Sequence, residues 1–288
     1  MASKVVSTWS LHRTLGSFQA ADLRSSRGSS AGRDADRFVQ RTQARSAAAG
    51  ALSLLELPAR LRTHDYDAVQ LVHFHLASRD RGYLAELRSE LTRANVLLDT
   101  FLVDDGDLTH ATDALADEDW ISEWIDDAVL LGARRVRVIA GRSDPSPQTI
   151  AQSAAALKRL SAAHSDVRIV IENWHELTPD AASVNSILDA AGDSIGLLVD
   201  LANWSGPGVC DELARIAGRA ETCHAKARLG SGAEGDRDGI RGYIAALEAI
   251  RGAGFSGSLA LVYDGADSDE WNMLELEYEV VRSVFEIV

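Results

Sequence analysis

The sequence predicts an α/β protein with a closed (β/α)8 barrel, forming a single domain over residues 1–288. Short apolar strands alternate with helical patterns along nearly the whole chain, and such alternation gives parallel strands with helices outside. Eight of these units in 288 residues match the usual size of the barrel. The alternative is an open doubly wound sheet. Its dinucleotide-binding version is disfavoured, because no glycine-rich phosphate loop follows the first strand.

The first half of the chain contains four expected strands and one long connection. Leucines at helical spacing, such as Leu84, Leu87 and Leu91, predict the helices between strands. A helix rich in tryptophan is expected to end near Gly132. Residues 17–50 are rich in Ser, Arg, Ala and Gly, and we interpret them as a long, mobile or lid-like loop with at most one helix. The strands are expected at residues 4–9, 68–75, 96–101 and 135–140.

The second half repeats the pattern with four more strands. Two of them end in a carboxylate, at Glu172 and at Asp200, and the other two are expected at 221–225 and 258–263. Apolar residues at helical spacing follow each strand. The corresponding helices are expected around residues 184–188, 209–216, 240–250 and 271–285.

Composition limits the classes of partner. The formal net charge of −14 disfavours binding to nucleic acid or to an anionic membrane. No apolar run approaches the roughly 20 residues that cross a bilayer, and the N-terminal residues lack the apolar core of a signal peptide. The two cysteines do not suggest a disulfide framework. We therefore expect a cytoplasmic protein without nucleic-acid or membrane partners.

Polar side chains gather where the predicted strands end. In a parallel barrel the active site lies at the carboxyl ends of the strands, so these residues should meet at one mouth. Five of the eight histidines are among them. The set comprises His12, His73, His75, Asp99, Glu172, Asn173, His175, Asp200, Asn203, His224, Lys226 and Asp264.

Three of these residues form a candidate metal site. Glu172, Asp200 and His224 offer two carboxylates and one imidazole from consecutive strands, a set that suits Mn²⁺, Mg²⁺, Co²⁺ or Zn²⁺. Each has a structural alternative: a salt bridge, a helix cap and a core histidine, respectively. Their equivalent positions on neighbouring strands favour the metal site, and we expect a divalent cation, Mn²⁺ first.

Four segments carry a resemblance to a known family. IVIENWHELT, LLVDLANWSG, CHAKA and GFSGSLALVYDG, in this order and spacing, resemble the sugar phosphate isomerase/epimerase family of xylose-isomerase-like TIM barrels. The resemblance extends from about Val5 to the last helix. It implies metal ligands at Glu172, Asp200 and His224. It also implies a place in carbohydrate metabolism, in a superfamily that includes sugar 3-epimerases, inosose isomerases and dehydratases, and abasic-site endonucleases.

The chain departs from the family pattern on the eighth strand. The family's fourth ligand is acidic, and Val262 occupies that position here. Asp264, two residues further on the same face, is the expected substitute, with water or Asn203 as alternatives. In the family's epimerases the carboxylates of strands five and eight are also the acid and base, so the loss of one disfavours a simple two-carboxylate mechanism.

The resemblance implies an isomerase or epimerase that removes a proton next to the carbonyl of a sugar or keto-sugar. Either Glu172 or His175 would act as the base. Lys226 would stabilise the oxyanion, or else form a structural ion pair. The expected substrate-binding residues are His12, His73, His75, Asn173 and Asn203.

Other functions remain open at this stage. A lyase or dehydratase acting on a 3-keto-sugar or glycoside by β-elimination, with or without a second subunit, is the main alternative. An abasic-site endonuclease is disfavoured by the acidic charge, and a non-catalytic sugar-binding barrel is the remaining option. The absence of a phosphate loop favours an unphosphorylated sugar or glycoside as substrate. We expect a homo-oligomer, with a hetero-oligomer as the alternative, in contact through residues 17–50 or the last helix.

Overall fold

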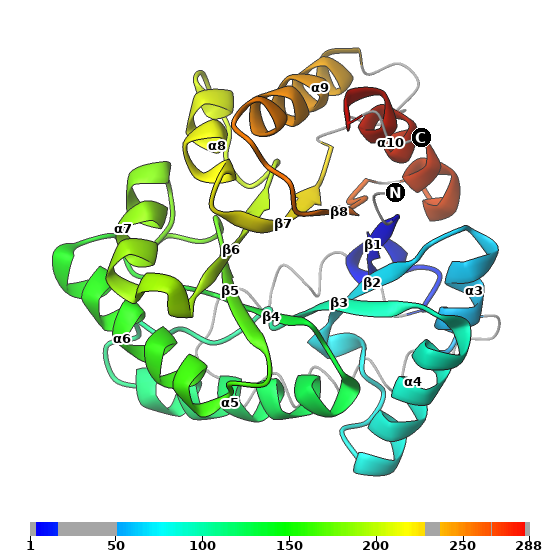
Figure 1. Cartoon of the computed structure of the whole chain (residues 1–288), viewed down its shortest axis with the longest axis horizontal. Helices are drawn as coiled ribbons and strands as arrows, with labels where there is room; N and C mark the ends of the chain where they lie inside the picture. The colour runs from blue at the N-terminus through cyan, green and yellow to red at the C-terminus, as the bar shows by residue number, and fades with distance from the viewer. Residues whose placement is uncertain (1–3, 17–50, 228–236, 266, 286–288) are drawn as a thin grey trace.

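The computed structural model describes residues 4–16, 51–227, 237–265 and 267–285. Eight parallel strands form a closed barrel in sequence order, with β1 pairing both β2 and β8 (Figure 1). The predicted fold is therefore confirmed. The strands are β1 (Val5–Ser7), β2 (Ala68–Val72), β3 (Leu97–Leu102), β4 (Arg135–Val138), β5 (Arg168–Glu172), β6 (Gly196–Asp200), β7 (Ala220–Ala225) and β8 (Ser258–Leu261).

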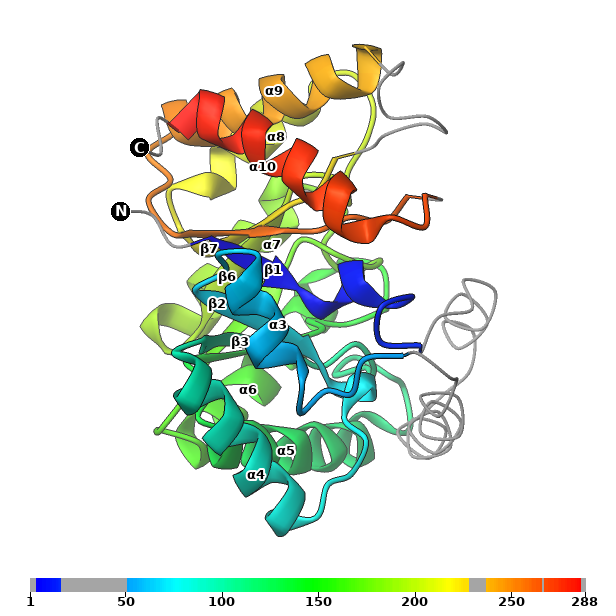
Figure 2. The same ribbon diagram turned by 90° about the vertical axis from the view of Figure 1, so that its right-hand side faces the viewer.

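Helices surround this barrel as an outer layer, which Figures 1 and 2 show from two directions. The predicted loop at 17–50 lies outside the described residues, so its conformation stays a prediction. Within the described residues, no helix is both long and apolar enough to cross a bilayer. The helices are α3 (Leu57–Thr63), α4 (Arg81–Ala94), α5 (Ala114–Leu131), α6 (Pro147–Ala163), α7 (Ala181–Ala191), α8 (Val209–Ala217), α9 (Arg237–Gly252) and α10 (Glu270–Phe285).

The main hydrophobic core lies between the strands and these helices. On α5, apolar residues at helical spacing turn one face inward, so that Trp124 is fully buried and stacks on Phe101 of β3. The helix ends as the sequence predicts. Gly132 adopts a left-handed conformation with φ of 82°, and this conformation lets its amide cap the last turn of α5.

Several strands are shorter than the sequence predicts. β1 ends at Ser7, because the Ser7 hydroxyl accepts an amide hydrogen bond from the turn η1 (Thr8–Leu11) that follows. β2 ends at Val72 and is followed by the 3-10 turn η3 (His73–His75). The prediction that the second strand continues to residue 75 is therefore wrong. The fourth and eighth strands also end two residues early.

Candidate metal centre

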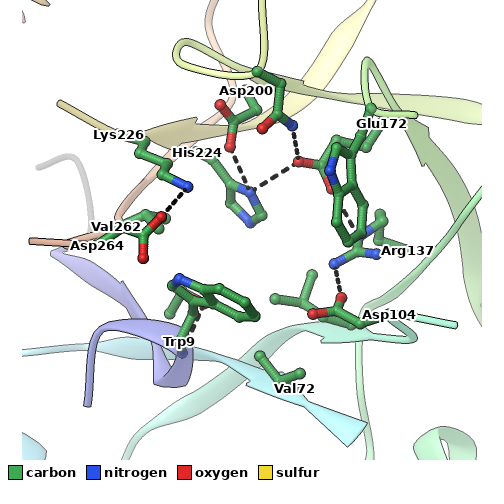
Figure 3. A pocket seen from close by; sticks show the side chains of 14 residues that line it. Trp9, Val72, Asp104, Arg137, Glu172, Asp200, His224, Lys226, Val262 and Asp264 are labelled. Atoms are coloured by element: carbon green, nitrogen blue, oxygen red, sulfur yellow. Dashed lines mark hydrogen bonds and ion pairs between the residues drawn. The ribbon is translucent and has the colours of Figure 1, made fainter. Parts of the chain in front are cut away.

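Glu172, Asp200 and His224 converge at the carboxyl-terminal mouth of the barrel. They belong to the neighbouring strands β5, β6 and β7, and Asp200 is the direct register partner of His224. One ligand atom from each lies within 4.8 Å of the others. His224 Nδ1 is 3.4 Å from Glu172 Oε1 and 3.4 Å from Asp200 Oδ2 (Figure 3). All three side chains are buried, so this triad forms a compact site.

The triad fits a divalent cation by charge as well as by spacing. Burial of His224 opposes its protonation, yet the two carboxylates outweigh burial and raise the pKa of His224 to about 9. The site thus attracts positive charge strongly enough to hold a proton on a buried imidazole. Two carboxylate oxygens and one imidazole nitrogen are typical ligands of Mn²⁺, Mg²⁺, Co²⁺ and Zn²⁺. The triad is therefore compatible with a divalent metal ion.

Neighbouring groups hold the two carboxylates in place. Asn203 Nδ2 donates to Glu172 Oε1 at 2.8 Å, and the Ala202 amide donates to Asp200 Oδ1 at 2.6 Å. Asn173 binds the backbone of Asp200 from both sides: its Nδ2 donates to the carbonyl, and its Oδ1 accepts from the amide. These contacts set the orientation of the carboxylates before any ligand binds.

An open cavity lies beside the triad. Residues of all eight strands, or of the segments that follow them, line it, so it is the central opening of the barrel mouth. Its mixture of polar and aromatic groups suits a small-molecule ligand. The lining residues are Ser7, Trp9, Val72, Leu102, Asp104, Arg137, Glu172, Trp174, Asp200, Asn203, His224, Lys226, Val262 and Asp264.

Lys226 and Asp264 form an ion pair on the side of the cavity opposite Glu172 (Figure 3). Lys226 Nζ is 2.9 Å from Asp264 Oδ2. Burial alone would lower the pKa of Lys226, but Asp200 and Asp264 raise it above its ordinary value, so the amine is cationic. Asp264 thus faces Lys226 and lies outside the cluster of three metal-ligating groups found among the described residues.

Arg137 is a site residue that sequence reasoning missed. Its guanidinium is buried, with Nε 3.0 Å from Glu172 Oε2, and it also pairs with Asp104. It lies 5.1 Å from the centre of the Trp174 ring. Burial alone would raise the pKa of Glu172, but Arg137 and His224 together lower it. Glu172 is therefore ionised. The available signal was an arginine at an inward-facing position of the short strand RVRV.

The histidines of the first two strand ends do not line the cavity. His12 Nδ1 and His75 Nε2 lie 2.9 Å apart, and His75 Nδ1 lies 2.8 Å from the Thr8 hydroxyl. His73 Nδ1 accepts from the Asp104 amide. Burial lowers the pKa of both His12 and His73 to about 3, so both rings are neutral near pH 7. The structure thus places these three histidines in a buried hydrogen-bonded layer outside the cavity lining.

His175 and Asn173 also lie outside the cavity lining, whereas Asn203 is part of it. His175 follows β5 with a positive φ of 69°, and its ring lies 4.0 Å from that of Trp174. This turn directs the residue away from the extended path of β5. Asn173 is fully buried against β6. Of the residues predicted to bind substrate or transfer protons, Glu172, Asn203 and Lys226 share the cavity.

Fold and site together define a (β/α)8 barrel with a buried candidate divalent-metal centre. The chain belongs to the xylose isomerase-like TIM barrel family, whose model matches residues 58–275. This finding confirms the resemblance seen in the sequence. No protein of curated function matches the sequence.

Solved structures with the same fold include enzymes of several activities. A xylose isomerase-like TIM barrel protein from Mycobacterium smegmatis, in complex with magnesium, is 14% identical. The match covers 80% of this chain and 88% of the M. smegmatis chain, with a TM-score of 0.61. The 3-keto-D-glucoside 4-epimerase from E. coli is 13% identical, and the match covers 80% of this chain and 94% of the epimerase, with a TM-score of 0.59. A probable 3-DHS dehydratase from Bacillus anthracis is 11% identical (97% and 98% covered, TM-score 0.61). At these identities the likeness establishes the fold alone.

Proposed function

We propose that this protein is a divalent-metal-dependent isomerase or epimerase that removes a proton next to the carbonyl of a sugar or keto-sugar. The observation that carries the proposal is the buried triad of Glu172, Asp200 and His224 beside an open cavity. Membership of the xylose isomerase-like family supports it. A bound divalent cation would polarise the substrate carbonyl and make the adjacent C–H acidic.

We propose that groups on two opposite sides of the cavity carry out the proton transfers. Glu172 is ionised beside Arg137 and is the proposed base. Lys226 faces it from the other side as an ammonium group, and in that state it can stabilise the negative charge that develops on the carbonyl oxygen or return a proton. His175, the alternative base of the sequence analysis, has no place in the cavity lining.

The charge of the cavity favours an uncharged substrate. Its lining has four carboxylates and the two cations Arg137 and Lys226, so with His224 neutral, as metal binding requires, its formal charge is −2, which one divalent cation neutralises. A sugar phosphate would bring negative charge without a free partner among the lining residues. Trp9 and Trp174 offer aromatic surfaces against which the apolar C–H face of a neutral sugar can pack. We therefore propose an unphosphorylated sugar or glycoside.

The ligand set does not select strongly among Mn²⁺, Mg²⁺, Co²⁺ and Zn²⁺. Mn²⁺ is the proposed physiological ion, on the family resemblance, and Asn203 or water would complete its coordination together with the triad. The magnesium complex of the M. smegmatis barrel supports a divalent ion in this fold.

The reaction class can be tested by solvent exchange. The purified protein, loaded with Mn²⁺, is incubated in D₂O with a panel of ketohexoses and 3-keto-glycosides, and products are analysed by NMR and mass spectrometry. Isomerisation or epimerisation predicts solvent deuterium at the carbon next to the carbonyl, with no loss of a substituent. Protein stripped of metal serves as the control and should exchange no deuterium. Exchange at an equal rate without metal would contradict the proposal.

A lyase acting on a 3-keto-sugar or glycoside is the second candidate, and one observation favours it. Val262 replaces the acidic residue of the eighth strand, while the Lys226 ammonium lies across the cavity from Glu172. Glu172 could remove the proton and Lys226 could protonate a departing oxygen, which is the division of labour that β-elimination needs. In the D₂O experiment this function predicts release of the leaving group and an unsaturated keto-sugar.

A further inference from the structure

Gln70 contacts His224 inside the barrel without lining the cavity. It lies in the middle of β2, and its side chain is fully buried. Gln70 Oε1 is 2.8 Å from His224 Nε2, the ring nitrogen that points away from the triad. A buried amide in this position can determine which nitrogen of the imidazole carries the proton.

The orientation of the Gln70 amide follows from its other contacts. Its Nε2 lies 3.0 Å from Asp99 Oδ2 and 3.0 Å from the Thr222 hydroxyl. Asp99 pairs with Arg135 at 2.8 Å, so its carboxylate can only accept hydrogen bonds. The amide nitrogen must therefore face Asp99, and the carbonyl oxygen must face His224.

This orientation has a consequence for the imidazole. An amide oxygen only accepts, so His224 Nε2 must be the donor and carry hydrogen. In the neutral ring the lone pair then lies on Nδ1, the atom that is 3.4 Å from both Glu172 Oε1 and Asp200 Oδ2. The lone pair is thus directed into the triad. Asp99 and Arg135 belong to this arrangement although neither lines the cavity.

We propose that Gln70 is a positioning residue that holds His224 in its Nε2–H tautomer and directs Nδ1 toward the cation. The inference rests on the proposed metal-dependent function, since it concerns how the chain prepares a metal ligand. Groups that hydrogen-bond to the second nitrogen of a ligating histidine fix its tautomer and strengthen metal binding, and their loss typically weakens affinity 10- to 100-fold.

Metal titration of a matched pair of variants tests this role. Gln70→Met keeps the length and volume of the side chain but cannot accept from His224, and we expect its Zn²⁺ affinity in calorimetry to fall about 10- to 100-fold. Ser153→Ala is the control: it removes a buried hydrogen bond, from Ser153 to the Ala140 carbonyl, that involves neither Gln70 nor His224. Its affinity should stay at the wild-type value. Equal affinities of Gln70→Met and wild type would overturn the proposal.

NMR of the wild-type protein tests the tautomer directly, whether or not Gln70→Met folds. In long-range ¹H–¹⁵N spectra of the Zn²⁺-loaded protein, His224 should carry its proton on Nε2. A proton on Nδ1 would overturn the role of Gln70 while leaving the metal-dependent function intact. If the wild type takes up no ion at all, the proposed function fails, and this inference fails with it.

Discussion

Arg137 stabilises the ionised form of two buried carboxylates in the site. Its guanidinium lies between the carboxylates of Glu172 and Asp104, and all three groups are largely shielded from water. A buried carboxylate without a partner is costly, and Arg137 offsets that cost for two of them. Glu172 is thereby kept ionised, because Arg137 and His224 lower its pKa against the effect of burial.

Replacing Arg137 with methionine should destabilise the metal-free protein by about 3–5 kcal/mol, because two buried carboxylates lose their partner. Urea unfolding measures this change. Arg241→Met is the control: Arg241 pairs with Asp238 on α9, where both side chains are exposed, so a loss of about 0–1 kcal/mol is expected. Similar losses in both variants would contradict the proposed role of Arg137.

A proton on His224 would compete with a metal ion bound at the triad. Glu172 and Asp200 overcome the effect of burial and raise the pKa of His224 to about 9, so below that pH a cation must displace a proton. Mg²⁺ affinity should therefore rise about tenfold per pH unit from pH 7 to 9 and then level off. The stability of the metal-free protein should follow the opposite trend. The proton on His224 contributes its full stabilisation below about pH 6.5, and this contribution is lost as the pH rises through about 9. Calorimetry showing a pH-independent Mg²⁺ affinity would contradict this coupling.

At the scale of strands, the candidate metal ligands could be predicted from the sequence, but the turns that end two of the strands could not. Glu172, Asp200 and His224 could be predicted because each lies at the same point of an apolar strand, and parallel topology brings such points together. The turn at residues 73–75 could not be predicted, because its sequence looks like a continuation of the strand. There the Val72 amide donates to a hydroxyl from a distant segment, that of Thr8.

Partners on other elements also explain why Arg137 escaped prediction. Its charge is balanced by residues from the segments that follow β3 and end β5, and only the folded barrel shows that they meet. A side chain also links β5 to β6 in a way that the sequence alone does not show. Asn173, predicted as a substrate contact, binds the backbone of Asp200 on the next strand.

Asn173→Ala tests whether Asn173 stabilises the contact between β5 and β6 or binds substrate. The variant removes two buried hydrogen bonds between β5 and β6, and we expect the free energy of unfolding to fall by about 1–3 kcal/mol. Because Asn173 does not line the cavity, sugar affinity at saturating metal should remain at the wild-type value. Urea unfolding and sugar titration measure the two quantities. Unchanged stability together with weakened sugar binding would instead support a direct contact with substrate.

At the scale of the whole molecule, the cavity exists only because the barrel is closed. Its lining draws on all eight strands or the segments after them, and β1 closes the barrel with only three residues between β2 and β8. An ion that ties β5, β6 and β7 together at the mouth should therefore stabilise the native state as a whole.

Adding Mn²⁺ should raise the melting temperature of the metal-free protein. At 100 times the dissociation constant the ion contributes about 2.7 kcal/mol, which corresponds to a shift of about 4–5 °C for a domain of this size. Thermal unfolding followed by circular dichroism measures it. His224→Ala should show no comparable shift, and a large shift in that variant would indicate that the ion binds elsewhere.

The central claim is that Glu172, Asp200 and His224 bind one divalent ion, and elemental analysis of the purified protein tests it most directly. The account predicts one ion per chain in the wild type, none in Glu172→Gln, and one again in Glu176→Gln, which alters a nearby exposed carboxylate. An ion retained by Glu172→Gln, or a wild type that takes up no divalent ion when one is supplied, would contradict it.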